Sequence, residues 1–378
     1  MANFWLKLNQ RVSSPDQSKA GLGLKLKKPI ITLAPMYDVT DSAFRQIVAG
    51  FCPKCPKSDF KGARSPTSGK PVFFTEFVSA DGLASEAGRA KLLRELYFTK
   101  TERPIVAQIF GAKPETIKKA VAIIRELGFD GVDINMGCPD RAVNKIGAGA
   151  ALIKTPKLAQ EIIAVAKSEA GKMPVSIKMR IGWGAPDKKE FTKWFKTILK
   201  AEPSVITIHF RTRNEMSEPE AHWAEFAPLA VKLAQRSGIL IMGNGDVKTV
   251  AEANELSKKY GLAGVMIGRG IFGRPWLFGR SERSRTSRES EVRLRSQPEI
   301  KLSLKILVKH TKLFGKMYGP GNFNTKNFGG HTKNFAVMKK HFKAYVSGFA
   351  GASDLRAKLM ASENSQEVEK IIRNFEIC

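Results

Sequence analysis

The sequence predicts an α/β fold, a (β/α)8 TIM barrel followed by a small C-terminal helical domain. Eight short runs rich in apolar and β-branched residues recur between residues 30 and 268, and segments with helical periodicity lie between most of them. Strands that alternate with helices are typical of a parallel sheet covered by helices, and eight such units favour a closed barrel. A doubly wound sheet is the alternative, but it seldom needs eight regular units.

The expected elements follow from these patterns. The strands are expected at residues 30–36, 72–78, 105–110, 131–135, 175–180, 205–210, 239–243 and 264–268. Residues 114–127 are expected to form a helix, because Ile117, Val121 and Ile124 fall on one face and a proline stands in the first turn. Another helix is expected to begin at Thr155, with its hydroxyl as the N-cap before a proline.

Residues 281–297 interrupt the alternation. They contain five arginines among serines and glutamates and very few apolar side chains, which predicts a linker. Helical patterns follow at residues 301–314, 334–349 and 366–375. The expected organisation is a catalytic barrel at residues 1–280, an Arg/Ser-rich linker at 281–297 and a helical domain at 298–378.

Charge is the strongest deviation in composition. The chain has 63 Lys and Arg against 35 Asp and Glu, a net charge of +28. This excess predicts a polyanionic partner, with nucleic acid first and an anionic membrane surface second, while general solubility is the plain alternative. The first ten residues lack a signal-peptide core, and no apolar run reaches membrane-spanning length, so a cytoplasmic protein is expected.

The four cysteines are too few for a disulfide scaffold in a chain of 378 residues. Cys52 and Cys55 have the spacing of half a zinc site. No second cysteine pair or histidine stands near them, so we expect no metal site. Residues 51–71 and 322–335, the latter with a repeated Thr-Lys-Asn-Phe sequence, are expected to be surface loops.

The loops after the seventh and eighth strands are candidates for phosphate binding. Barrels often bind phosphate there through backbone N–H groups. Glycines that merely permit tight turns are the alternative. The loops supply small residues and one cation, namely Asn244, Gly245, Asp246, Gly268 and Arg269.

Polar side chains also follow the other strands. Lys178 lies within a strand, where a buried ammonium needs an anion or an electron-rich ring edge. A structural ion pair with Asp133 or Glu76 is the alternative. Gln108 can bond a donor and an acceptor of a planar ring, or can be satisfied inside the barrel. His209 is a ligand donor in this setting, although a lone inward histidine is more often a core residue.

Cys138 is the most informative residue. It follows a short strand, stands between glycine and proline in Asn135-Met136-Gly137-Cys138-Pro139, and is poorly suited to packing. At a strand exit its thiol is well placed to present a weak acid to a ligand, and a side chain that merely fills space is the alternative.

These segments together resemble the tRNA-dihydrouridine synthase family of bacterial type. The resemblance runs from residue 32 to about residue 278 and resumes more weakly at residues 337–359. The motifs that carry it are Ala34-Pro35-Met36, Thr40-Asp41, Phe44-Arg45, Thr75-Glu76-Phe77-Val78-Ser79-Ala80, Asn135-Met136-Gly137-Cys138-Pro139, Lys178-Met179-Arg180, His209-Phe210-Arg211-Thr212, Asn244-Gly245-Asp246, Ile267-Gly268-Arg269-Gly270 and Pro275-Trp276.

The resemblance implies a flavoenzyme that reduces the C5–C6 bond of uridine in tRNA, with FMN bound and NADPH or NADH as reductant. Cys138 would be the catalytic acid, and Asn135 and Arg180 would hold the substrate base. The residues implied to contact FMN are Pro35, Met36, Tyr37, Gln108, Lys178, His209, Asn244, Gly245, Asp246, Gly268 and Arg269. The residues of the helical domain implied to contact tRNA are Lys339, Lys340, His341 and Lys343.

Some segments depart from the family pattern. The loop Arg213-Asn214-Glu215-Met216-Ser217 is atypical, and lysine stands at residue 339 where many relatives have arginine. These departures bear on which uridine is modified. A dihydroorotate dehydrogenase-like FMN barrel that acts on a free pyrimidine is one alternative, and an RNA-binding barrel without catalysis is another. No membrane association and no protein partner are expected.

Overall fold

The structure is a computed structural model that describes Phe4, Trp5, Leu8 and residues 28–52, 70–279, 295–319 and 332–375. The chain forms two compact units. The first contains Met1–Pro35, Pro71–Leu92 and Arg103–Arg269, and the second contains Met36–Lys70, Leu93–Glu102 and Gly270–Cys378. Most of the linker expected at residues 281–297 lies outside the described residues.

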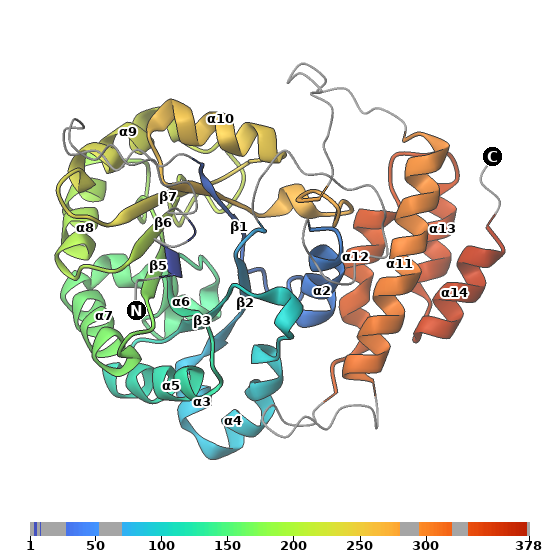
Figure 1. Cartoon of the computed structure of the whole chain (residues 1–378), viewed down its shortest axis with the longest axis horizontal. Coiled ribbons are helices and arrows are strands. Elements are labelled where there is room, and N and C mark those ends of the chain that lie inside the picture. The colour runs from blue at the N-terminus through green and yellow to red at the C-terminus, as the bar shows by residue number, and fades with distance from the viewer. Residues whose placement is uncertain are drawn as a thin grey trace, which may run out of the picture. The chain divides into compact units, whose positions relative to one another are not determined.

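The first unit is built around a barrel of eight parallel strands (Figure 1). The strands are β1 (Ile30–Leu33), β2 (Phe73–Ser79), β3 (Ile105–Phe110), β4 (Gly131–Met136), β5 (Val175–Arg180), β6 (Val205–His209), β7 (Leu240–Asn244) and β8 (Gly264–Ile267). They pair in the order β1-β8-β7-β6-β5-β4-β3-β2. A parallel bridge between Thr32 and Val72 closes the ring. The predicted (β/α)8 barrel and its eight strands are therefore confirmed, although β1 ends at Leu33.

Helices accompany the strands of the first unit, and most of them lie around the barrel (Figure 1). They are α3 (Ala80–Ala84), α4 (Glu86–Leu92), α5 (Pro114–Glu126), α6 (Arg141–Lys145), α7 (Pro156–Ala170), α8 (Lys188–Lys200), α9 (Trp223–Ala234) and α10 (Val250–Tyr260), with the 3-10 helix η3 (Gly149–Lys154) before α7. Ile117, Val121 and Ile124 of α5 are buried, as the periodicity predicts. Thr155 is the N-cap residue of α7, as expected, but the expected cap by its hydroxyl is wrong, because its side chain makes no capping hydrogen bond.

The second unit is helical and has its own apolar core. Its elements are α2 (Ser42–Gly50), η1 (Leu93–Leu96), η2 (Lys100–Glu102), α11 (Gln297–Tyr318), η5 (Phe335–Val337), α12 (Met338–Tyr345), α13 (Ala352–Met360) and α14 (Ser365–Arg373). Ser296 and Glu299 form a capping box that begins α11. Ile47 of α2 belongs to the same core as Leu307 and Phe342, so a helix from early in the sequence packs with the C-terminal helices.

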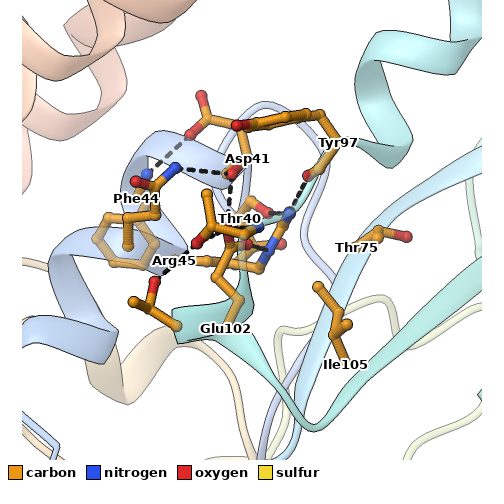
Figure 2. A network of polar contacts seen from close by, with 12 residues as sticks. Thr40, Asp41, Phe44, Arg45, Thr75, Tyr97, Glu102 and Ile105 are labelled. Atoms are coloured by element: carbon orange, nitrogen blue, oxygen red, sulfur yellow. Dashed lines mark hydrogen bonds and ion pairs between the residues drawn. The ribbon is translucent and has the colours of Figure 1, made fainter. Parts of the chain in front are cut away.

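A buried polar network joins the early segments of the second unit (Figure 2). The Arg45 guanidinium donates to the carbonyls of Thr40 (2.6 Å) and Tyr97 (2.7 Å) and to the Glu102 carboxylate (2.7 Å). Both side chains of the Arg45–Glu102 pair are fully buried. Burial raises the pKa of Glu102, while the charge of Arg45 opposes that rise. Ser42 also donates to Glu102, at 2.8 Å. The network fixes the start of α2 against η2.

Candidate active site

The pairing register brings the predicted polar residues to one end of the barrel. Asn135 of β4 stands opposite Lys178 of β5, and Arg180 stands opposite His209 of β6. His209 in turn stands opposite Asn244 of β7. Because the strands are parallel, these positions share the carboxyl edge of the sheet, where barrel enzymes carry their active sites.

Asn135 connects the barrel interior to the Cys138 loop. Its amide nitrogen donates to the side-chain oxygen of Gln108 (3.0 Å), and Gln108 donates to Asp133 (2.6 Å). The Asn135 side-chain oxygen accepts from the backbone N–H groups of Gly137 (3.0 Å) and Cys138 (2.8 Å). Gln108 and Asn135 are therefore satisfied within the protein, and Asn135 holds the backbone that carries the thiol.

The Cys138 thiol is half-buried in a loop that follows β4. Burial is the main reason that the pKa of the thiol is raised, and the Asp140 carboxylate adds to it. Hydrogen bonding from the Asp140 backbone and the charges of Arg180 and Lys178 act in the opposite direction. A raised pKa keeps the thiol protonated at neutral pH, which suits a proton donor rather than a nucleophile.

Lys178 carries a charge that the described residues leave without a partner. Its ammonium group makes no hydrogen bond or ion pair in that part of the chain. Burial, followed by the neighbouring charge of Arg180, lowers its pKa to about 8. Asp133 forms no ion pair with Lys178 within hydrogen-bonding reach; its oxygens accept from Gln108 and Ser176 at 2.6 Å each, and its charge only opposes the fall of the Lys178 pKa. A half-buried cation in this state suits an electron-rich or anionic ligand.

Arg180 is held by the backbone on two sides. Its Nε donates to the Gly137 carbonyl (2.8 Å), and Nη1 donates to the carbonyls of Thr212 (2.7 Å) and Met216 (2.8 Å). Burial lowers its pKa to about 10, so it stays charged at neutral pH. Arg180 therefore fixes the Cys138 loop against the loop after β6, and its Nη2 makes no hydrogen bond to the described residues.

A chain of polar contacts runs from His209 to Arg269 across β6, β7 and β8. Arg211 contacts His209 Nε2 (3.1 Å) and donates to Asp246, which also accepts from Arg269 (2.9 Å). Burial and the surrounding cations lower the pKa of His209 well below its usual value. The ring is thus neutral, with Nε2 accepting from Arg211 and the proton on Nδ1. Nδ1 has no partner among the described residues and is available as a donor.

Arg211 is a site residue that sequence reasoning left without a role. It stands two residues after the end of β6, where its N–H donates to the His209 carbonyl (2.8 Å), and this tight turn brings the two side chains together. Burial would raise the pKa of Asp246, but the hydrogen bond from Arg211 lowers it overall. Asp246 is therefore an ionised bridge between two arginines, and Arg269 presents a largely exposed guanidinium.

The loop after β7 requires a glycine at residue 245. Gly245 has φ +132°, and a Cβ there would lie 2.6 Å from the Cβ of Ala221. Asn244 donates to the Met266 carbonyl (2.9 Å), which ties the ends of β7 and β8 together. Gly268 follows β8 directly and is half-buried. The loops after β7 and β8 therefore lie next to each other at the carboxyl edge of the barrel.

The residues after β1 divide between the two units. Pro35 ends a segment of the first unit, in which the Ala34 N–H donates to the Ile267 carbonyl (2.9 Å). Met36 and Tyr37 belong to the second unit, where Met36 N–H donates to the Thr40 hydroxyl (2.9 Å) and Tyr37 is 60% exposed.

The lysines predicted to contact RNA lie on α12 of the second unit. Lys340 and Lys343 are exposed and Lys339 is half-buried. Lys340 forms an ion pair with Asp38 at 3.0 Å. His341 is only 4% exposed, and its ring lies 5.1 Å from that of Phe44 and 4.5 Å from that of His310. This position makes His341 a packing residue of the second unit.

Two further features concern metal and membrane. Within the described ranges, no group of three or more His, Cys, Asp or Glu side chains is placed to hold a metal ion. Cys52 is buried and its thiol donates to the Val48 carbonyl at 3.4 Å, while Cys55 lies outside those ranges. None of the helices that the structure describes is long and apolar enough to cross a membrane.

Comparison with known proteins identifies the family. Residues 32–376 match the family model described as dihydrouridine synthase. Probable tRNA-dihydrouridine synthase 2 of Bacillus subtilis (strain 168) is 36% identical over 355 residues, which cover 93% of this chain and 95% of the relative. The probable tRNA-dihydrouridine synthase of Staphylococcus aureus (strain COL) is 35% identical, with 93% and 94% covered. The chain therefore belongs to the dihydrouridine synthase family.

Proposed function

We propose that the protein reduces the C5–C6 double bond of a uridine in tRNA to 5,6-dihydrouridine, with FMN as bound cofactor and NADPH as reductant. The observation that carries this proposal is the unpartnered Lys178 ammonium beside the protonated Cys138 thiol. The two side chains are close enough to influence each other's pKa. A cytoplasmic location, where tRNA is found, goes with this proposal.

The residues at the mouth of the barrel fit a phosphorylated flavin. Bound FMN supplies hydride chemistry, which protein side chains lack. Lys178 would hold the electron-rich edge of the ring, and the Nδ1–H of His209 would donate to an acceptor of the cofactor. The backbone around Gly245 and Gly268, together with Arg269, would bind the phosphate.

The protein's own contribution to the reaction is positioning and proton delivery. The thiol of Cys138 would donate a proton to C5 of the uracil ring as hydride reaches C6. Asn135 holds the Cys138 backbone, and the free Nη2 of Arg180 would donate to an acceptor on the edge of the base. A base inside a stacked helix cannot reach such a site, so the target uridine would have to leave its stack.

The first prediction concerns Lys178 and the pH dependence of FMN binding. The Lys178 ammonium, with a pKa of about 8, is charged below that pH and loses its proton above it. If the charged form binds FMN, affinity stays level from pH 7 to 8 and then falls, by up to about tenfold per pH unit. Fluorescence titration of apoprotein with FMN from pH 7 to 9.5 measures this. Lys178→Met should bind more weakly and show no fall, and a fall of equal size in that variant would contradict the assignment.

The second prediction concerns RNA binding by the helices of the second unit. Replacing Lys339 and Lys343 of α12 and the exposed Lys358 of α13 with glutamine should weaken tRNA binding, because each lysine that neutralises a phosphate releases a counterion. Loss of three contacts should lower the slope of log Kd against log salt by roughly 2–3. Filter binding at several salt concentrations measures the slope.

A triple variant of barrel lysines is the matched control for this measurement. Lys118, Lys196 and Lys258 are exposed and lie on α5, α8 and α10. Their replacement with glutamine removes the same charge and should leave the slope nearly unchanged. Equal slopes for the wild type and for the second-unit variant would show that these three lysines do not contact RNA.

Two measurements test the proposed function together: the presence of bound flavin and the substrate that stimulates NADPH oxidation. The purified protein should show a flavin absorbance spectrum, which a barrel that only binds RNA would lack. Unmodified tRNA should stimulate NADPH oxidation, whereas orotate and dihydroorotate should not. Stimulation by the free pyrimidines instead of tRNA would support the dihydroorotate dehydrogenase-like alternative and reject the proposal.

A further inference from the structure

Two cations next to the Cys138 loop are held by one aromatic ring. Trp183, which follows β5, has the Lys154 ammonium 3.7 Å from its ring centroid and the Arg213 guanidinium carbon 5.0 Å from it. Lys154 ends η3, and Arg213 stands in the loop after β6 that departs from the family pattern. Three separate loops at the carboxyl edge of the barrel therefore meet at this ring.

The ring holds the two cations without cancelling their charge. Neither Lys154 nor Arg213 forms an ion pair with a carboxylate in the described part of the chain. The nearby carboxylate of Glu215 is occupied by the Thr212 N–H (2.7 Å) and by His222 (2.7 Å). A cation over an indole is attracted by the ring quadrupole, yet it keeps its full charge for a further anion. The arrangement therefore presents positive charge instead of neutralising it.

Asn144 links this pair of cations to the proposed proton donor. Its amide nitrogen donates to the Cys138 carbonyl (2.9 Å), and its side-chain oxygen accepts from Nε of Arg213 (3.0 Å). Nη1 of Arg213 donates to Asn214 at 3.3 Å, and Nη2 has no partner among the described residues. The guanidinium is thus fixed in orientation by its Nε and keeps an N–H edge for an acceptor.

We propose that Lys154 and Arg213 form a subsite for the backbone phosphates of the RNA strand that carries the target uridine. This inference rests on the proposed function, because it places the strand relative to Cys138. Phosphate contacts fix the register of a nucleic acid, whereas contacts to the base carry specificity. The Asn144 side chain by itself links Arg213 to the Cys138 backbone. A strand whose phosphate is bound by Arg213 would therefore present the neighbouring nucleotide to the thiol. The 2′-phosphate of NADPH has the same chemistry and is the other source that the experiment has to distinguish.

The double variant Arg213→Gln/Lys154→Gln tests the subsite in the full-length flavoprotein. Steady-state rates with unmodified tRNA are measured at several salt concentrations, and KM for NADPH is measured separately. We expect kcat/KM for tRNA to fall at least tenfold. The salt slope of log kcat/KM should decrease by about 1–2, because each lost phosphate contact removes close to one released counterion. KM for NADPH should be unchanged.

Two further variants keep the test decisive. Lys119→Gln/Lys193→Gln removes the same charge from exposed positions on α5 and α8, and its salt slope should match that of the wild type. Arg213→Lys keeps the charge and should retain the wild-type slope even where loss of the Nε bond lowers the rate. If Arg213→Gln/Lys154→Gln matches the control, or raises KM only for NADPH, the RNA subsite is wrong. If the wild type itself leaves tRNA unreduced, the proposed function fails instead.

Discussion

Replacing Cys138 with alanine is expected to lower the rate of uridine reduction in tRNA by about 10²–10⁴-fold, the range that a general acid contributes. The thiol is kept protonated because burial raises its pKa, and the Asn135 side chain fixes its backbone. Alanine offers no proton, so C5 of the uracil would depend on water. Single-turnover reduction of tRNA by the pre-reduced enzyme measures the loss.

The Cys138→Ala variant should keep its flavin spectrum and its affinity for tRNA, because the side chain is small and its backbone bonds remain. Cys52→Ala is a suitable control, since that thiol belongs to the second unit, is buried, and donates to the Val48 carbonyl. It should turn over tRNA like the wild type. Wild-type rates for Cys138→Ala would exclude the thiol as the proton donor.

The second large effect concerns stability. Glu102→Gln should lower the free energy of unfolding of the second unit by about 3–5 kcal/mol, because it leaves the buried Arg45 guanidinium without its counter-charge. The pair is fully buried, and Arg45 cannot turn to solvent while it donates to the carbonyls of Thr40 and Tyr97. Urea unfolding followed by circular dichroism, with hydrogen exchange of the α2 amides, measures the change.

Glu369→Gln provides the comparison for this result. Glu369 also accepts from an arginine, at 2.8 Å to Arg373, but that arginine is largely exposed. Solvent screens such a pair, so its loss should shift the unfolding midpoint much less. A shift for Glu102→Gln as small as that for Glu369→Gln would mean that the buried pair does not hold α2 in place.

The barrel could be predicted because each of its strands is one continuous segment with its own sequence pattern. Each strand is a short apolar run, and parallel strands need helices between them, so order along the chain already gives order around the ring. The carboxyl-edge positions of Asn135, Lys178, His209 and Asn244 follow from strand ends together with the two-residue repeat of side-chain direction.

Other features depend on contacts between distant segments and were not visible in the sequence. The second unit recruits Met36–Lys70 and Leu93–Glu102, because α2 shares an apolar core with α11 and α12. His341 follows two lysines in the sequence, but the helix turns its ring into the buried interior of the second unit. Arg180 donates mainly to backbone carbonyls of the loops that follow β4 and β6. Backbone partners of this kind have no sequence signature.

The central claim is tested most directly by mapping dihydrouridine in tRNA treated with the protein. An unmodified tRNA transcript is incubated with the protein, FMN and NADPH, and its nucleosides are analysed by mass spectrometry and located by sequencing. The account predicts the gain of two hydrogen atoms on uridine at a defined loop position, and its absence with Cys138→Ala. Transcript that stays unreduced by flavin-bound wild type, or equal dihydrouridine with Cys138→Ala, would contradict the account.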